Sequence, residues 1–326
     1  MKFKDAAELY FDIKQGLIKP SSFTNMKRLY RDHISEYFDD IELDKITSRE
    51  MQKFYNLLAN KTSGRNSNER LSEHTIKDIV GLAKTICYNA MAEGEMQECR
   101  FKLKKPYGMR QVENGQAEYL SEEDYKKVMS ICLDCDFNHN GKAKIMTVLA
   151  LTTGMRIGEI CGLRWEDVDL ENGYIKVNCT VQRIIREDGS SYIHIGDPKS
   201  QTSKRKVLIL EAAKQVLLQY KSHNKIANER LYVIGGEKPN EPRTIRQAYA
   251  RFLKNIDVPY IHPHALRHTF CTYSIANGCD IKTISQLLGH SKTDITLDTY
   301  THITQKQIDK TTNKLNEIFS TGNTSK

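Results

Sequence analysis

The stretch IHPHALRHTF, Ile261–Phe270, places three histidines and one arginine within seven positions of a chain that has ten histidines in all. Pro263 suits the first turn of a helix, where its missing N–H would have no partner in any case. On such a helix His264 and Arg267 are three residues apart, so their side chains project from one face. We therefore expect a helix to begin here and to offer an imidazole and a guanidinium to the same ligand.

A phosphate is the ligand that this face favours. A guanidinium forms bidentate hydrogen bonds with phosphate oxygens, and the backbone N–H groups of a helix N-terminus add to the positive field. Zinc is the alternative, because His262, His264 and His268 are possible ligands. The Arg267 cation beside them would repel a metal ion, so the residues indicate a phosphate and predict neither a metal site nor a cofactor.

Composition sets broad limits on the class of protein. The chain has 326 residues, and 49 Lys and Arg against 41 Asp and Glu give it a net charge of +8, which favours two domains and a polyanionic partner such as nucleic acid. Among the eight cysteines only Cys132 and Cys135 form a CxxC pair, which predicts reduced thiols. The N-terminus lacks the apolar run of a signal peptide, and no later run has the length of a membrane span. We therefore expect a cytoplasmic protein without a membrane partner.

Residues 1–100 have the apolar periodicity of helices separated by short polar turns. Thr47 begins the pattern Thr-x-x-Glu of a helix start, and Ser72 precedes another long amphipathic stretch. No strand pattern interrupts these helices. The sequence therefore predicts a small helical bundle as the first domain.

A basic segment, residues 101–117, follows the helices and is predicted to link two domains. Pro106 and Gly108 oppose regular structure within it. The segment is either a solvated charge run or a strap that crosses a phosphate backbone. Its candidate DNA-backbone contacts are Lys102, Lys104, Lys105 and Arg110.

Residues 118–326 are predicted to form a mixed α+β domain that ends in a C-terminal tail helix. Ser121 begins the first of its helices. Between Tyr174 and Leu210 four short runs are rich in β-branched residues, with a turn at Glu187–Gly189. The whole chain is therefore predicted to be mainly α with a small antiparallel β-sheet.

Several common catalytic motifs do not occur in the sequence. It has no G-x-x-x-x-G-K-[ST] phosphate loop, no G-x-G-x-x-G after a strand, no H-E-x-x-H and no G-x-S-x-G. The sequence therefore offers no recognisable machinery for an ATP-driven or nicotinamide-dependent reaction.

Six residues in a fixed order carry a resemblance to a known family. They are Arg156 in TGMRIGE, Lys199 in PKSQTSKR, His264 and Arg267 in HALRH, His290 in LLGH, and Tyr300 ten residues later in YTH. This set resembles the catalytic residues of the tyrosine recombinase (phage integrase) family, and within it the integrases of conjugative transposons and temperate phages. The resemblance covers residues 118–304, while the helical first domain is similar to the family's core-binding domain in length and pattern.

The resemblance implies a metal-free and ATP-free strand transfer. Tyr300 would attack a scissile DNA phosphate and form a 3′-phosphotyrosyl link, while Lys199 gives a proton to the departing 5′-oxygen, which leaves as a 5′-hydroxyl. His264 and His290 would complete the ring of donors, and either could take the proton of the tyrosine. The reaction would serve integration or excision of a mobile element.

The resemblance also implies roles for the arginines and for partners. Arg156 and Arg267 would each hold a non-bridging oxygen, and Glu159 would orient Arg156. The two domains would close around double-stranded DNA as a clamp, and four protomers would assemble on two duplexes, with accessory DNA-bending or excision factors as further candidate partners. The chain begins almost directly with the helical bundle, so either the protein lacks the arm-binding domain of longer integrases or that domain has been trimmed from this sequence.

Other classes of DNA-acting protein remain open at this point. A type IB topoisomerase uses a similar tyrosine and cationic pocket but acts as a monomer. A catalytically idle DNA-binding regulator would not need all six residues. A DDE-type transposase or metal-dependent nuclease needs a convergent acidic triad, which the sequence does not show.

Overall fold

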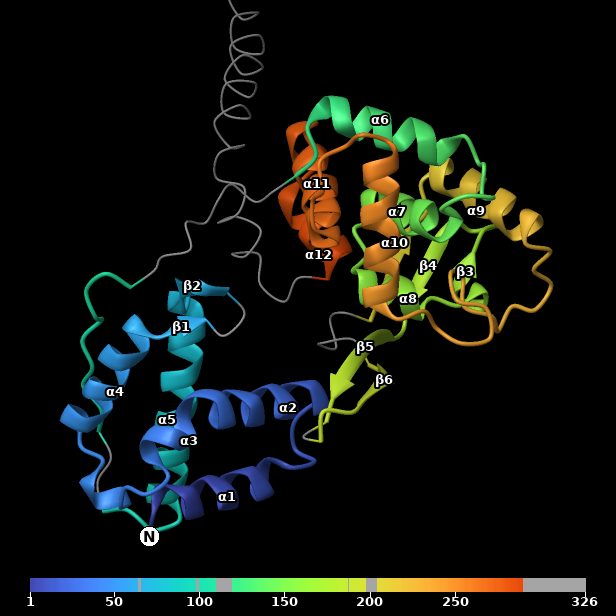
Figure 1. Ribbon diagram of the computed structural model, residues 1–326. Helices are drawn as coiled ribbons and strands as arrows, with labels where there is room; N and C mark the ends of the chain where they lie inside the picture. The colour runs from blue at the N-terminus through green and yellow to red at the C-terminus, as the bar shows by residue number, and fades with distance from the viewer. Residues whose placement is uncertain (64–65, 98–99, 110–118, 187, 198–203, 290–326) are drawn as a thin grey trace, which may run out of the picture. The chain divides into compact units, whose positions relative to one another are not determined.

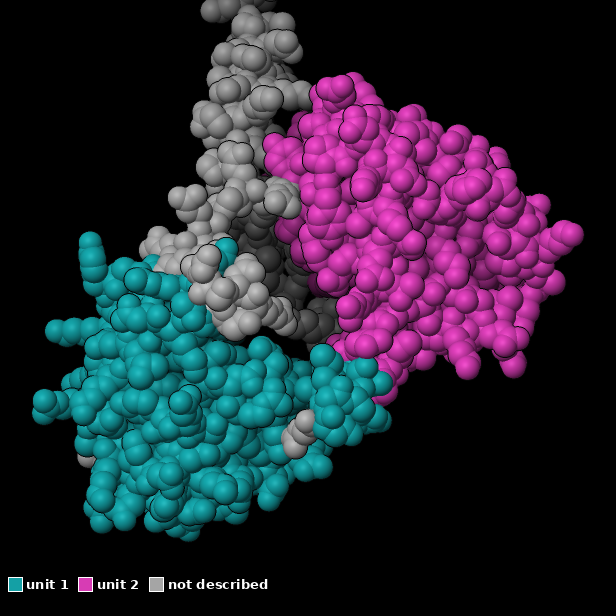
Figure 2. All heavy atoms as spheres, in the orientation of Figure 1, with its two compact units in different colours: residues 1–115, 184–191 teal, residues 116–183, 192–326 magenta. Residues whose placement is uncertain are grey.

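The computed structural model describes residues 1–63, 66–97, 100–109, 119–186, 188–197 and 204–289. The chain divides into two compact units with separate hydrophobic cores. Unit 1 comprises residues 1–115 and 184–191, and unit 2 comprises residues 116–183 and 192–326 (Figure 2). The predicted domain ranges 1–100, 101–117 and 118–326 stay a prediction. Among the described helices, none has the length and apolarity needed to cross a lipid bilayer.

Unit 1 is built mainly from helices whose apolar faces meet in one core. Three aromatic rings lie at its centre, with the Phe38 centroid 5.1 Å from that of Phe3 and 4.8 Å from that of Phe54. The elements are α1 (Phe3–Lys14), α2 (Pro20–Leu29), a π-helical turn (Tyr30–Ile34), α3 (Ser35–Phe38), a 3₁₀ turn (Leu43–Lys45), α4 (Ser48–Asn60) and α5 (Glu73–Ala92).

Local capping explains where two of these helices begin. The Thr47 hydroxyl accepts from the N–H of Glu50 at the start of α4, and the Ser72 hydroxyl accepts from the N–H of Thr75 at the start of α5. Each bond satisfies one of the backbone donors that a helix N-terminus leaves without an intrahelical partner. Both starts agree with the sequence prediction.

The expectation that no strand interrupts the helices of unit 1 was wrong. Strands β1 (Thr62–Ser63) and β2 (Asn66–Arg70) pair antiparallel between α4 and α5. The segment is polar throughout and lacks the apolar alternation that identifies a half-buried strand. Its pairing rests on backbone hydrogen bonds, which leave no trace in a hydrophobic pattern.

Unit 2 is arranged around one helix that is buried over most of its length. Residues from Ala143 to Thr153 of this helix are all buried, and helices pack on it from several sides (Figure 1). Its buried threonines are satisfied internally; Thr147, for example, donates its hydroxyl to the Ala143 carbonyl at 2.8 Å. The helices of unit 2 are α6 (Glu122–Leu133), the central α7 (Gly141–Thr153), α8 (Ile157–Gly162), α9 (Glu211–His223), α10 (Pro242–Asn255), α11 (Pro263–Ala276) and α12 (Ile281–Leu288), with a 3₁₀ turn at Trp165–Asp167.

The strands that follow α8 in the chain form two small sheets. They are β3 (Val168–Asp169), β4 (Tyr174–Val177), β5 (Thr180–Ile185), β6 (Ser191–Gly196) and β7 (Arg205–Leu208). One sheet has the antiparallel order β3-β4-β7, and β5 pairs with β6 in the other. The four strands expected from the sequence are present, and the fold class is confirmed as mainly α with small antiparallel sheets.

Gly154 ends α7 at a point where a side chain has no room. Its φ is +65°, in the left-handed region, and its N–H donates to the Ala150 carbonyl. A Cβ placed there would lie 2.3 Å from Leu288 Cδ2 and 2.9 Å from the ring of Phe270. The turn from α7 to α8 therefore passes beneath α11 and α12 only because residue 154 is glycine.

We predict that Gly154→Ala destabilises the protein more than Gly173→Ala does. Gly173 also has a left-handed φ, of +71°. A Cβ added there would have the Ile209 carbonyl oxygen as its nearest neighbour, at 4.0 Å. Both changes should cost about 1–2 kcal/mol for the backbone conformation. Gly154→Ala should cost roughly a further 1–3 kcal/mol for overpacking. Urea unfolding followed by circular dichroism measures both, and equal losses would contradict the predicted clash.

Candidate active site

The helix predicted in the opening stretch begins where the sequence indicates. Pro263 is the first residue of α11, and His262 caps it by accepting the N–H of His264 on its Nδ1 at 3.2 Å. The ring of His264 contacts that of His268 edge to face, with centroids 4.9 Å apart. His262 and His268 therefore have structural neighbours of their own, beside the predicted site residue His264.

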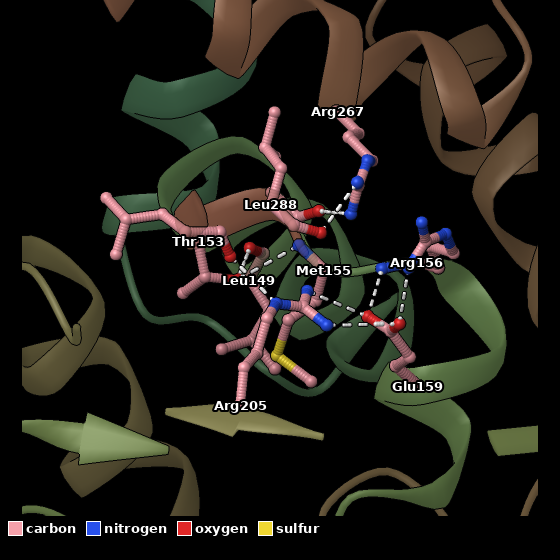
Figure 3. Close-up of polar contacts among 10 residues, drawn as sticks. Leu149, Thr153, Met155, Arg156, Glu159, Arg205, Arg267 and Leu288 are labelled. Atoms are coloured by element: carbon pink, nitrogen blue, oxygen red, sulfur yellow. Dashed lines mark hydrogen bonds and ion pairs between the residues drawn. The ribbon is translucent and has the colours of Figure 1, made fainter. Parts of the chain in front are cut away.

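Arg267, one turn further along α11, is buried and ties three segments together. Its Nη1 donates to the Gly154 carbonyl at 2.8 Å, and its Nη2 donates to the Leu288 carbonyl at 2.7 Å (Figure 3). The guanidinium thus joins the ends of α7 and α12 to α11. These bonds engage two of its five N–H groups.

Arg156 lies at the start of α8 and is fixed on one side by Glu159. The backbone N–H of Arg156 donates to Glu159 Oε2 at 3.0 Å, and its Nη1 donates to Oε1 at 2.8 Å (Figure 3). The Arg156 side chain is 31% exposed, whereas that of Glu159 is 2% exposed. Arg156 therefore presents part of its guanidinium to solvent while a buried carboxylate holds the rest.

Arg205 is a member of this cluster that sequence reasoning missed. It begins β7, is 7% exposed, and forks onto Glu159 with Nη1–Oε1 and Nη2–Oε2 distances of 3.2 and 3.0 Å (Figure 3). Its Nε donates to the Leu287 carbonyl at 2.7 Å. The one sequence signal was indirect: a glutamate in a helix as apolar as IGEICG needs a buried cation, and the chain downstream of Lys199 supplies one.

Two guanidinium groups contact the Glu159 carboxylate and a third, that of Arg267, interacts with them electrostatically, so the cluster has an excess of positive charge. Burial raises the pKa of Glu159, but Arg205 and, less strongly, Arg156 lower it, and the net pKa lies below the ordinary value. Burial and the Arg156 cation lower the pKa of Arg267. Such an arrangement favours an anion, because an anion would offset the repulsion between the guanidinium groups.

His264 adds an imidazole that is neutral at neutral pH. Desolvation by surrounding atoms, followed by the effects of His268 and Arg267, lowers its pKa below the ordinary value, although the residue is exposed. A neutral ring keeps one nitrogen as a hydrogen-bond donor and the other as a proton acceptor.

The structure therefore brings together Arg156, Glu159, His264 and Arg267 of the predicted site. Four predicted residues lie outside the described part of the chain: Arg110, Lys199, His290 and Tyr300. Across the ranges that are described, His, Cys, Asp and Glu side chains nowhere form a group of three that could hold a metal ion.

The predicted basic strap is fastened along α4 in unit 1. The Ser48 hydroxyl donates to the Arg100 carbonyl at 2.7 Å and accepts the N–H of Lys102 at 3.2 Å. The Gln52 amide both donates to the carbonyl and accepts the N–H of Lys104, at 2.9 and 2.8 Å. Two side chains one helical turn apart thus bind the backbone of the strap, as the backbone of a neighbouring strand would in a sheet.

This fastening makes the side chains of the strap alternate. Phe101 and Leu103 pack against the core of unit 1, whereas Lys102 and Lys104 are exposed. Lys105 is also exposed, but its ammonium pairs with Glu73 at 2.7 Å. Lys102 and Lys104 are therefore the two candidate backbone contacts whose exposed side chains are not paired with a carboxylate of the described residues.

Comparisons with known proteins identify the family of this chain. The model described as "Phage integrase family" matches residues 118–307, and the one described as "Phage integrase, N-terminal SAM-like domain" matches residues 2–59. The chain is 29% identical to a XerC-like tyrosine recombinase of Caldanaerobacter subterraneus, over 95% of this chain and 81% of the relative. It is 27% identical to the integrase of Staphylococcus phage L54a, over 95% and 90% of the two chains.

A solved structure shows the same fold. The integrase of transposon Tn1549, in complex with a circular intermediate DNA, matches with a TM-score of 0.73 and 22% identity, over 92% of this chain and 95% of that one. The family model covers more than half of the 326 residues. The chain therefore belongs to the phage integrase family and is a site-specific tyrosine recombinase.

Proposed function

We propose that this recombinase cuts and rejoins double-stranded DNA through a 3′-phosphotyrosyl intermediate on Tyr300, for integration or excision of a mobile element. One observation carries the proposal: Arg156 and Arg205 bond to the carboxylate of Glu159, Arg267 lies close enough to interact electrostatically with Arg156, and the Arg156 side chain reaches solvent. A phosphodiester is an anion that such a site suits. Tyr300, the last of the six family residues in the sequence, is the proposed nucleophile.

The proposed step is a transesterification. The Tyr300 oxygen forms a bond with phosphorus, the bond from phosphorus to the 5′-oxygen breaks, and Lys199 gives that oxygen a proton. The covalent intermediate keeps the energy of the phosphodiester, so attack by a 5′-hydroxyl can rejoin the strand without ATP or another cofactor.

The nucleophile needs a base, because the ordinary pKa of a tyrosine is about 10. His264 and His290 are the two candidates. The lowered pKa of His264 supports it as a proton acceptor, since its ring is neutral at neutral pH.

Arg156 and Arg267 are the proposed stabilisers of charge on the non-bridging oxygens. Phosphoryl transfer depends mainly on positioning and on charge stabilisation. Removal of one such donor typically costs about 3–4 kcal/mol of barrier. The contacts of Arg267 with two carbonyls and of Arg156 with Glu159 support this role, because they fix both guanidinium groups before DNA binds.

The number of strands that the reaction breaks determines the number of protomers that we propose. Exchange between two duplexes breaks four strands, and each protomer has one Tyr300. Four protomers on two duplexes would therefore be needed, which is the homo-tetramer expected from the family.

We predict that Tyr300 becomes covalently linked to DNA in the presence of EDTA. The substrate is a duplex that spans the junction of element and host and has a nick close to the cleavage site. After cleavage the short fragment that carries the new 5′-hydroxyl dissociates, so it cannot rejoin and the covalent intermediate is trapped. Incubation without metal or ATP should give a protein–DNA band on a denaturing gel. Tyr300→Phe should abolish this band and keep DNA binding.

A band that persists in Tyr300→Phe would show that another residue is the nucleophile. The absence of a band from wild-type protein that still binds the junction would contradict the proposed cleavage and favour the idle-regulator alternative.

We predict that the double change Lys102→Gln and Lys104→Gln weakens DNA binding in a salt-dependent way. Loss of two phosphate contacts should reduce the slope of log K against log salt by about 1.8, at roughly 0.9 for each contact. The matched control is Lys45→Gln, an exposed lysine of unit 1 whose ammonium pairs with Glu42 at 2.8 Å. Fluorescence anisotropy over a salt series measures the slopes, and an equal reduction in the control would contradict a specific role for the strap.

A further inference from the structure

Arg205 makes contacts that link three segments of the candidate active site. Its guanidinium forks onto both oxygens of Glu159 on α8, and its Nε donates to the Leu287 carbonyl in the last turn of α12. Its own backbone begins β7, directly after residues 198–203, which include Lys199. One buried side chain is therefore adjacent in space or in sequence to the segments that carry Arg156, Lys199 and His290.

The contact with Glu159 determines what Arg156 is able to do. A buried carboxylate needs charged or polar partners on both oxygens. Arg205 supplies one partner to each oxygen, which leaves Arg156 to contribute only Nη1 and its backbone N–H. Arg156 is thereby oriented by Glu159 without its whole guanidinium being used there.

The contact with α12 places the chain that leads to His290. The last carbonyls of a helix have no intrahelical partner, and cations are favourable at this end. Arg205 takes the carbonyl of Leu287 and Arg267 takes that of Leu288, just before Gly289 turns the backbone with a φ of +68°. Two arginines thus fix the point at which the chain leaves α12.

We propose that Arg205 is a positioning residue for strand cleavage, which acts on Arg156 through Glu159 and on the end of α12 through Leu287, and does not touch the DNA itself. This inference rests on the proposed function, because it assigns Arg156 to the phosphate. It differs from the role given to Arg156, whose side chain is 31% exposed, since the Arg205 side chain is 7% exposed and its Nε, Nη1 and Nη2 all donate to protein groups.

The test is a double-mutant cycle on covalent-complex formation under single-turnover conditions, with Arg205→Gln, Glu159→Gln and the double variant. We expect Arg205→Gln to slow cleavage by about 100-fold, the size of effect that misplacement of a catalytic group produces. DNA affinity should stay within about threefold, because phosphate contacts elsewhere dominate it. In the Glu159→Gln background the same change should cost less than about threefold, because the residue through which Arg205 acts is already lost.

Equal losses in the two backgrounds would overturn the proposal, since they would mean that Arg205 acts independently of Glu159. An Arg205→Gln variant that is folded and as fast as wild type would also overturn it. If Arg205→Gln does not fold, Arg205→Lys serves instead, because lysine keeps the charge but lacks the fork. We expect this variant to be slowed by about tenfold, and wild-type speed would contradict the proposal.

The control for loss of a buried cation is Lys144→Met. Lys144 is 6% exposed and pairs with Asp134 at 2.7 Å, away from the residues of the site. Its loss should lower thermal stability and leave the cleavage rate of the folded protein unchanged. A comparable loss of rate in this control would show that the Arg205 effect is general destabilisation.

A second readout does not depend on cleavage. Carboxyl-carbon NMR should show the pKa of Glu159 higher in Arg205→Gln than in wild type, because burial then acts with less opposition from cations. An unchanged pKa would contradict the proposed hold on Glu159. If wild-type protein forms no covalent complex, the proposed function fails, while this titration still decides whether Arg205 controls Glu159.

Discussion

The buried carboxylate of Glu159 requires cations around it, and the arrangement of the candidate site follows from that requirement. A carboxylate that is 2% exposed is costly unless charged partners satisfy both of its oxygens. Arg156 and Arg205 meet this need from α8 and β7, two segments almost fifty residues apart in sequence. Removing one partner from such a buried pair typically costs about 3–5 kcal/mol, which links the stability of unit 2 to the integrity of the site.

Arg156 and Arg205, which share Glu159, differ in their exposure. Arg205 is nearly enclosed and bonds to protein groups, while Arg156 is partly exposed and reaches toward solvent. Arg267 is buried, yet its two carbonyl bonds fix the guanidinium beside Arg156 (Figure 3). The positive charge that a phosphodiester needs is thus assembled and oriented in the free protein, so little reorganisation would accompany DNA binding.

Local signals in the sequence were enough to predict the starts of α4, α5 and α11. Thr47, Ser72 and Pro263 each act within a few residues of where they stand, so a single sequence reveals them. Arg205 could not be found in this way, because its contact with Glu159 depends on β7 lying beside α8 in three dimensions. The polar β1–β2 hairpin was missed because backbone pairing carries no hydrophobic period. The geometry of Lys199, His290 and Tyr300 stays a prediction, since these residues lie outside the described ranges.

A crystal structure of Tyr300→Phe bound to an uncut junction duplex tests the central claim most directly. The measured quantities are the distances from each guanidinium nitrogen to the oxygens of the scissile phosphate. The account predicts that Arg156 and Arg267 hydrogen-bond to non-bridging oxygens of this phosphate, while Arg205 stays on Glu159 and the Leu287 carbonyl. A phosphate held by Arg205, or one beyond the reach of Arg156, would contradict it.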